Sequence, residues 1–384
     1  MKITENREDK TKKTFPKTLF LIKLTIFVTK LTIFTNMKRV ATTLLFVIFA
    51  MTLYARPIYP KAGENWERAK PSKYGFNDQK IKELRRYIID SMATTGMMII
   101  VGGECIFQYG NIERLSYIAS CRKSVLSMLY GKYVENGTID LNKTLGELGI
   151  TDRGGLLPIE QKAKVLHLIQ ARSGIYHQAS NSGSALDNPS RVPERGSVKP
   201  GAKFLYNNWD FNAAGTVFEK MTGKSIYTAL EEDLALPLGF QDWDISQQRY
   251  GGNKKRSIHP AYHIYISTRD MARLGYLMLR KGEWEDKEII TKNWHRKMIA
   301  VSTKPKEVSK REHFGYGYMW WLYNDKNPAL KGAYAAHGAG GQYITVIPEL
   351  DMVIAHKTDA IYGRKTKSSR YQRLVRKIIS AKEQ

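Results

Sequence analysis

A serine and a lysine one helical turn apart are the residues of this chain best placed to do chemistry. Ser120 and Lys123 form the only S-x-x-K in the sequence, and apolar residues recur at spacings of three and four from Val125 to Val134. That spacing predicts a helix, on which positions i and i+3 share a face. A hydroxyl becomes a good nucleophile when a base takes its proton, and a neutral lysine can be that base. The pattern fits a serine hydrolase, although a Ser three residues before a Lys is also common on basic surface helices.

A second polar group follows a Pro-Gly turn. Tyr206 and Asn208 precede a predicted helix that begins near Trp209. A phenol beside a lysine amine can pass protons between nucleophile and leaving group, and an amide can hold both groups in place. Taken alone, the pattern fits an ordinary half-buried aromatic residue beside a helix N-cap better. The same Y-x-N spacing occurs in Tyr109-Gly110-Asn111.

A glycine-rich stretch, Ala336–Gln342, runs into the predicted strand Tyr343–Ile347. Glycines at the start of a strand allow a ligand or another backbone to approach closely. Backbone N–H groups in this stretch can complete an oxyanion hole together with the N–H of Ser120. A lone histidine beside glycine, such as His337, is more often a packed or exposed residue than a catalytic one.

The three stretches, in this order, resemble the serine β-lactamase and penicillin-binding-protein superfamily, in which S-x-x-K is a known motif. The resemblance is closest to the class C-like, β-lactamase-related serine hydrolases, which include esterases and 6-aminohexanoate-dimer hydrolases. It covers roughly residues 70–380 and extends to these supporting phrases: Ala171-Arg172-Ser173-Gly174, Pro200-Gly201, Pro237-Leu238-Gly239, Ser267-Thr268-Arg269-Asp270, and Tyr316-Gly317-Tyr318 before Trp320-Trp321. It implies an α+β, β-lactamase/transpeptidase-like fold.

The resemblance implies a role for each residue of the first two motifs. Ser120 is the acylated nucleophile and Lys123 its general base. Tyr206 is the proton relay and the acid for the leaving group, and Asn208 positions Lys123 and the substrate.

The third element of the family is usually K-T-G or H-x-G. We align it with Ala336-His337-Gly338, so that His337 and Gly338 face the substrate and Ala339 supplies the second oxyanion N–H. A shift of one or two residues would use His337-Gly338-Ala339 or Gly338-Ala339-Gly340 instead. Each alignment lacks the lysine that β-lactamases offer to the carboxylate of a β-lactam. This difference favours a small ester, amide or peptide-like substrate.

The sequence therefore predicts a serine hydrolase that forms an acyl-enzyme on Ser120 and needs no metal and no organic cofactor. No Cys/His cluster with metal-ligand spacing is present. One alternative is a β-lactamase or D-alanyl-D-alanine carboxypeptidase. An alternative from another class is an inactive relative that only binds peptidoglycan fragments. The acyl group, the leaving group and the oligomeric state stay open.

Strands are expected near both ends of the chain and helices between them. Met97–Val101 and Ile106–Tyr109 form a predicted hairpin, and strands return at Gln342–Ile347 and Met352–His356. Helices are predicted after Asn77, after Ser120 and after Ser267. Four more are predicted at Gln161–Gln170, Trp209–Met221, Ile226–Leu236 and Tyr371–Ile379. This order predicts an antiparallel sheet from N- and C-terminal segments, flanked by helices, with a mainly helical insertion at about 138–260 in a catalytic domain 56–384.

The N-terminal residues are predicted to be an upstream extension (1–36) and a signal peptide (37–55). Met37-Lys38-Arg39 is followed by an apolar run and then by Ala55, where a signal peptidase would cut. Met37 is then the true start, although the sequence does not decide between Met1 and Met37. The alternative is a membrane anchor at 40–55, which is short for a span. We expect export to the periplasm or the exterior, with no stable membrane span after cleavage.

The net charge of +25 invites a nucleic-acid partner, but its distribution argues against one. Residues 1–55 carry ten Lys/Arg and three acids, which leaves +18 scattered over residues 56–384. No basic stripe interleaves with aromatic residues there, so acidic envelope polymers are the more plausible partners. Cys105 and Cys121 are the only cysteines, and the sequence does not decide whether they pair.

Overall fold

The computed structural model describes residues 57–182, 190, 192–360 and 363–383, together with 28–30, 32, 34, 35, 37 and 39. The chain forms two compact units, Met1–Arg56 and Pro57–Gln384. In the first unit the described residues are helical. The predicted extension and signal peptide lie almost wholly outside the described residues, so both stay predictions. In the part of the chain that the structure describes, no helix combines the length and the apolar character needed to cross a bilayer.

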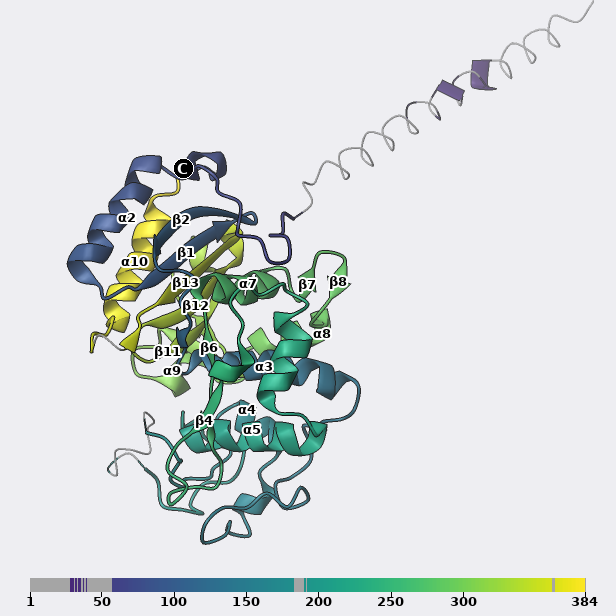
Figure 1. Cartoon of the computed structure of the whole chain (residues 1–384). Helices are drawn as coiled ribbons and strands as arrows, with labels where there is room; N and C mark the ends of the chain where they lie inside the picture. The colour runs from purple at the N-terminus through teal and green to yellow at the C-terminus, as the bar shows by residue number, and fades with distance from the viewer. Residues whose placement is uncertain are drawn as a thin grey trace, which may run out of the picture. The chain divides into compact units, whose positions relative to one another are not determined.

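A seven-stranded antiparallel sheet forms the centre of the second unit (Figure 1). Its strands lie in the order β2-β1-β13-β12-β11-β10-β9. Their bounds are β1 Gly96–Val101, β2 Glu104–Gly110, β9 Phe314–Tyr316, β10 Trp321–Tyr323, β11 Tyr334–Gly338, β12 Gln342–Ile347 and β13 Met352–Lys357. Because β1 pairs with β13, the N-terminal hairpin is joined directly to the C-terminal strands. The predicted α+β class, with a sheet built from both ends of the chain, is confirmed.

Helices cover both faces of this sheet. The helices α2 (Asp78–Ser91) and α10 (Ser368–Ser380) pack together on one face, and α7 (Thr268–Leu279) packs on the other. As predicted, Asn77 caps α2 by accepting a hydrogen bond from a backbone N–H, and Ser267 caps α7 in the same way. The apolar residues of the sheet thus belong to two hydrophobic clusters, one on each face.

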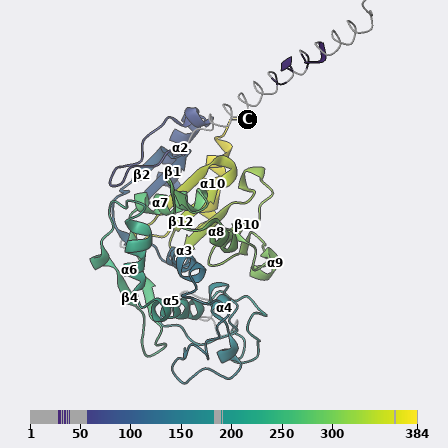
Figure 2. The same ribbon diagram turned by 90° about the vertical axis from the view of Figure 1, so that its right-hand side faces the viewer.

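The predicted insertion at about 138–260 is a region of helices joined by loops, in which the loops make up the larger part (Figure 2). It contains α4 (Val165–Ile169), α5 (Asn208–Thr222) and α6 (Ile226–Leu230). The helix α3 (Cys121–Glu135) contacts both β11 and β12 on one side and α5 and α6 on the other. The remaining elements are the short strands β3 Ser116–Tyr117, β4 Arg249–Gly251, β5 Ala261–His263, β6 Tyr265–Ile266, β7 Glu283–Trp284 and β8 Lys287–Glu288, and the helices α8 Lys292–Ile299 and α9 Pro305–Val308.

Two helix predictions in this region are wrong in part. The predicted helix Gln161–Gln170 is a 3₁₀ turn, Glu160–Lys162, followed by α4. The break occurs because Ala163 accepts a backbone hydrogen bond from Leu145 and is held extended, which an α-helix does not allow. The predicted helix Ile226–Leu236 begins as expected, but it continues from Glu231 as a π-helical turn. Backbone pairing with distant segments overrides local propensity at the first of these positions.

Candidate active site

Ser120 lies where the chain turns sharply from β3 into α3. The turn needs Ala119 in the left-handed region (φ 48°), which a non-glycine residue adopts only at a cost of roughly 1–2 kcal/mol. Cys121 N–H then donates to the Ile118 carbonyl at 3.1 Å, and Lys123 N–H donates to the Ser120 carbonyl at 3.1 Å. Ser120 is thus the N-cap residue of α3, where the positive end of the helix dipole favours developing negative charge.

The helix that follows is buried on all sides over its first ten residues. The side chains from Cys121 to Tyr130 are all buried, including those of Arg122 and Lys123. A helix that packs against a sheet on one side and other helices on the other has no solvent face. Lys123, with 2% of its surface exposed, is therefore a buried lysine.

Three polar groups surround the Lys123 amine. Its Nζ lies 3.1 Å from Ser120 Oγ, 2.7 Å from the Tyr206 hydroxyl and 2.8 Å from Asn208 Oδ1. A neutral amine has two N–H donors and one lone pair. It can therefore donate to the Asn208 amide oxygen and the Tyr206 hydroxyl while it accepts the proton of Ser120. The structure thus brings together the four residues predicted for the first two motifs.

The electrostatic surroundings favour the neutral form of Lys123. Burial, followed by the positive charge of Arg122, holds the pKa of Lys123 well below its usual value. The rings of Tyr206 and Phe211, whose centroids lie 4.2 and 4.3 Å from Nζ, act in the opposite direction. A desolvated cation–π contact is worth about 2 kcal/mol, whereas desolvation of an ammonium costs several kcal/mol. No carboxylate forms an ion pair with Lys123 among the described residues, so desolvation prevails.

Tyr206 stays protonated at neutral pH. Burial raises the pKa of Tyr206 to about 12, against the opposing effects of Ser120 and Arg122. Its ring lies 4.9 Å from that of Phe211 and 5.4 Å from that of Trp321. A protonated phenol in contact with the lysine amine can give a proton and take one back, as a relay requires.

Asn208 is oriented by a hydrogen bond on its other side. Its Nδ2 donates to the Ser182 carbonyl at 2.8 Å, which turns Oδ1 toward Lys123. Asn208 is the first residue of α5, and Asn207 caps that helix by accepting from the Asp210 N–H at 2.8 Å. Both neighbouring amides thus have fixed and different partners.

The glycine-rich stretch lies against the start of α3. A Cβ at Gly338 would be 2.5 Å from the Ile118 carbonyl oxygen, so only glycine fits there. The Cys121 thiol donates to the Gln342 carbonyl at 3.3 Å and fixes the same junction. Ala339 follows the end of β11 and is exposed. Within the described part of the chain, neither the Ser120 N–H nor the Ala339 N–H donates to a backbone carbonyl. Their role as oxyanion donors stays a prediction.

His337 lies in a group of aromatic rings. It stacks on Trp321 (5.5 Å between centroids, 13° between planes) and meets Phe314 and Tyr343 edge to face. Burial lowers the pKa of His337 to about 3, and Nε2 has no hydrogen-bond partner among the described residues. Trp321 lies between this ring and Tyr206. The structure does not place His337 in contact with the lysine amine.

Cys105 and Cys121 are both buried free thiols. Within the described residues, no three His, Cys, Asp or Glu side chains are grouped as metal ligands would be. The prediction that the reaction needs no metal or cofactor stays a prediction.

Sequence reasoning missed three residues of the site. Trp321 packs on Tyr206, Arg122 adds a charge beside Lys123, and Ser182 orients the amide. Arg122 had a signal because it lies inside the S-x-x-K motif, and Trp321 had one because it belongs to a phrase that carries the family resemblance, whereas Ser182 had none.

Residues 84–370 match the family described as Beta-lactamase. The match covers well over half of the chain, and the chain therefore belongs to this family. Its fold is the β-lactamase/transpeptidase-like fold that the motifs predicted.

Solved structures share this fold. A Bacillus anthracis protein assigned as a 6-aminohexanoate-dimer hydrolase superimposes with a TM-score of 0.62 at 18% identity, covering 84% of this chain and 88% of that one. A penicillin-binding-protein homologue from Caulobacter crescentus gives a TM-score of 0.59 at 14% identity, with coverages of 82% and 98%. EstCE1, a hydrolase with promiscuous acyltransferase activity, gives 0.58 at 15% identity, with coverages of 78% and 97%. At these identities the likeness concerns the fold.

Proposed function

We propose that this protein is a serine hydrolase that cleaves a small ester, amide or peptide-like bond through an acyl-enzyme on Ser120. The observation that carries the proposal is the position of Lys123 Nζ, which lies within 3.1 Å of Ser120 Oγ, the Tyr206 hydroxyl and Asn208 Oδ1 in a buried site. A buried lysine whose pKa is lowered and whose hydrogen-bond partners Ser120, Tyr206 and Asn208 are neutral is suited to accept a proton.

The first half-reaction follows from this geometry. As Ser120 Oγ bonds to the substrate carbonyl carbon, its proton passes to Lys123 Nζ, and the carbonyl oxygen becomes an oxyanion held by the N–H groups of Ser120 and Ala339. When the carbon–leaving-group bond breaks, the proton returns through Tyr206 to the leaving oxygen or nitrogen. Lys123 is neutral again at the end.

The second half-reaction repeats these steps with water. Lys123, directly or through Tyr206, takes a proton from the water that attacks the acyl carbon, and the bond to Ser120 Oγ breaks with return of that proton to the serine. Asn208 keeps the amine in place through both halves.

The substrate class rests on the third motif. The end of β11 and the residue after it are His337, Gly338 and Ala339, with no lysine, so this stretch offers no cation to the carboxylate of a β-lactam. Hydrolase and penicillin-binding-protein homologues are both among the proteins with this fold. A nitrocefin assay beside a p-nitrophenyl acetate assay separates ester hydrolysis from the β-lactamase alternative. Stoichiometric binding of peptidoglycan fragments without turnover would instead support the inactive-relative alternative.

The test of the nucleophile is the Ser120→Ala variant. We expect wild-type protein to gain the mass of a fluorophosphonate adduct and Ser120→Ala to gain none. Ser127→Ala is the matched control, because Ser127 lies on the same helix and its buried hydroxyl has no partner to lose among the described residues. Labelling that persists in Ser120→Ala but disappears in Ser127→Ala would assign the nucleophile elsewhere.

We also propose that the protein is exported, on the basis of the charged, apolar and small-residue pattern of residues 37–55. The expected observation is a mature protein whose intact mass corresponds to cleavage near Ala55. An uncleaved chain in the cytoplasm would contradict export.

A further inference from the structure

Arg122 is a buried cation without an anionic partner. It has 1% of its surface exposed. Its Nη2 donates to Asn212 Oδ1 at 3.0 Å, and its guanidinium carbon lies 4.2 Å from the centre of the Tyr262 ring. Its Nη1 makes no hydrogen bond to any described residue, and no described carboxylate forms an ion pair with it. Because arginine is almost never fully buried unless it is paired, this arrangement calls for a reason.

The next residue along the chain, Lys123, is one of the buried titratable groups on which this charge acts. Lys123 shares the same buried turn of α3, and no described carboxylate is paired with either side chain. In a low-dielectric site the free-energy cost of charging two adjacent basic side chains is high, and arginine does not give up its proton. The cost therefore falls on the lysine.

We propose that the buried, unpaired guanidinium of Arg122 keeps Lys123 in the neutral form that accepts the serine proton, so that Arg122 is a positioning residue for acyl transfer. The inference rests on the proposed function of Ser120 and Lys123. The positive charge of Arg122 is the second cause, after burial, of the lowered pKa of Lys123.

No other group facing the pair competes for this role. From α5 come the neutral Asn208, Asn212 and Phe211, and from the preceding loop comes Tyr206, whose phenol is protonated. A carboxyl on α5, that of Asp210, accepts hydrogen bonds from the Ser173 N–H and hydroxyl. Other titratable neighbours are Tyr262 and His263 of β5, Tyr227 of α6, Cys121, and Lys357 at the end of β13.

These other neighbours are neutral or cationic, never anionic. Burial raises the pKa of the Tyr227 and Tyr262 phenols and of the Cys121 thiol. Burial and then Arg122 lower the pKa of His263 to about 4, so a second group responds to the same charge. Lys357 Nζ is held by backbone carbonyls, including that of Ser116 at 3.2 Å.

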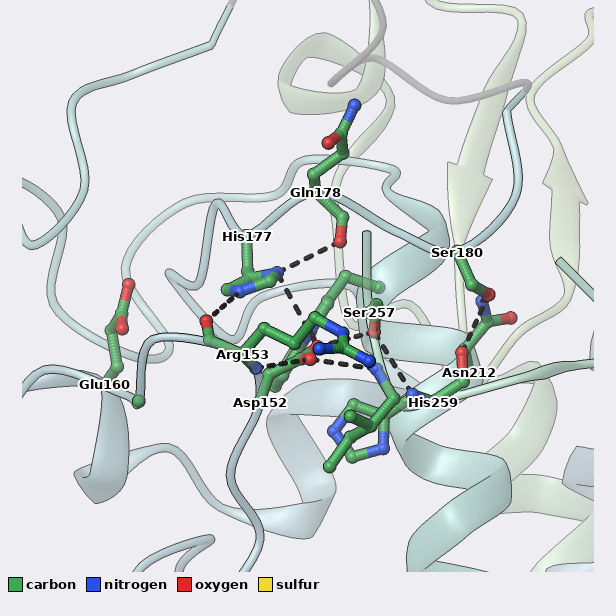
Figure 3. Close-up of polar contacts among 12 residues, drawn as sticks. Asp152, Arg153, Glu160, His177, Gln178, Ser180, Asn212, Ser257 and His259 are labelled. Carbon is green, nitrogen blue, oxygen red and sulfur yellow. Dashed lines mark hydrogen bonds and ion pairs between the residues drawn. The ribbon is translucent and has the colours of Figure 1, made fainter. Parts of the chain in front are cut away.

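Asn212 holds the guanidinium without neutralising it. While its Oδ1 accepts from Arg122, its Nδ2 donates to Asn181 Oδ1 at 2.9 Å and to Ser180 Oγ at 3.2 Å. Figure 3 shows Asn212 beside Ser180. Ser180 Oγ in turn donates to the His259 carbonyl at 2.7 Å. An aspartate at position 212 could accept from the arginine equally well. The amide therefore leaves the arginine charge uncompensated.

The experiment compares the pH dependence of Ser120 acylation in four proteins. Wild type, Arg122→Gln, Asn212→Asp and Asn212→Leu are labelled with a fluorophosphonate between pH 5 and 10, and the rate is followed by intact mass. Arg122→Gln removes the charge and keeps an amide beside Asn212. Asn212→Asp compensates the charge with a side chain of the same shape. Asn212→Leu breaks the contact and leaves the charge.

We expect the midpoint of the acidic limb of the rate profile to lie about one pH unit higher in Arg122→Gln and in Asn212→Asp than in wild type. This is the shift that a unit charge about 12 Å away produces at an effective dielectric constant near 20, and a closer charge produces more. Below the wild-type midpoint, labelling then slows about tenfold. In Asn212→Leu the rate falls but the midpoint stays.

Each contrary outcome has a separate meaning. If wild type is not labelled on Ser120 at any pH, the proposed function fails. If wild type is labelled and Arg122→Gln keeps the same midpoint, Arg122 does not act on Lys123 and the inference is overturned. An equal shift in Asn212→Leu would also overturn it, because packing rather than charge would then be the cause. If Arg122→Gln does not fold by circular dichroism, Asn212→Asp decides in its place.

Discussion

Asn208→Asp is the substitution that tests the lysine base most directly. The side chain keeps its shape, but a neutral amide oxygen 2.8 Å from Lys123 Nζ becomes a carboxylate oxygen. The donor to the Ser182 carbonyl is lost at the same time. The neutral amine would then lie in contact with an anion, which stabilises the ammonium form.

The magnitude follows from the distance. Two unit charges 2.8 Å apart attract by about 6 kcal/mol at an effective dielectric constant of ~20, which corresponds to roughly four pKa units for Lys123. Desolvation of the new carboxylate offsets part of this attraction. Even half of the shift would leave little neutral lysine at pH 7. Since general base catalysis is worth ~10²–10⁴, we expect kcat/KM at pH 7 to fall by about that factor.

The assay is p-nitrophenyl acetate hydrolysis from pH 6 to 10, with fluorophosphonate labelling as a second readout. The midpoint of the acidic limb should lie several pH units higher in Asn208→Asp than in wild type, so that activity recovers in part at high pH. The matched control is Asn207→Asp, one residue earlier, where the side chain caps α5 and aspartate caps equally well. A rate for Asn208→Asp within a few-fold of wild type at pH 7, with an unmoved limb, would refute the lysine-base reasoning.

Two further predictions concern residues beside the site. His337→Phe should keep kcat/KM within about threefold from pH 5 to 9, because the imidazole is neutral throughout and its Nε2 binds nothing among the described residues; a loss of ~10²-fold would show that it acts as an acid or base. Asp152→Asn should lower the free energy of unfolding by about 2–5 kcal/mol, since the carboxylate accepts from Ser257, Trp209 and two backbone N–H groups (Figure 3) and an amide would leave donors unpaired. Burial opposes ionisation, but these hydrogen bonds lower the pKa of Asp152 below its unfolded value of about 3.9. The difference in unfolding free energy between wild type and Asp152→Asn, measured with urea, should therefore be full above pH 4 and shrink in more acidic solution. A difference that does not change with pH would contradict this origin.

The helices and strands that the sequence predicted best have a local cause. Asn77 and Ser267 cap helices with their own side chains, and the hairpin of β1 and β2 turns through Gly102 and Gly103. These features depend on residues close together in the chain. They can therefore be predicted without knowing the fold.

The strands around the third motif could not be predicted in this way. β9 and β10 have three residues each, which is too short for an alternating pattern to be visible. β10 pairs with the edge of β11, and β9 in turn pairs with β10. The break at Ala163 has the same kind of origin, since its partner Leu145 is distant in the chain. Pairing between distant segments leaves no local signal in a single sequence.

In the candidate site, too, one feature is local and can be predicted, and another depends on the packing of distant segments. The S-x-x-K spacing predicts that Ser120 and Lys123 share a face, which is a property of any helix. Whether Lys123 is a base depends on its burial. The apolar spacing from Val125 to Val134 marks a buried face of α3, but it does not reveal that the polar side chains of Arg122 and Lys123 are buried as well. A surface helix with the same four residues would hold an ammonium and an inert hydroxyl. The proposed proton transfer therefore depends on the packing of α3 between the sheet and α5. Arg122 can act on Lys123 because it is buried there too, whereas solvent would screen the same charge on a surface.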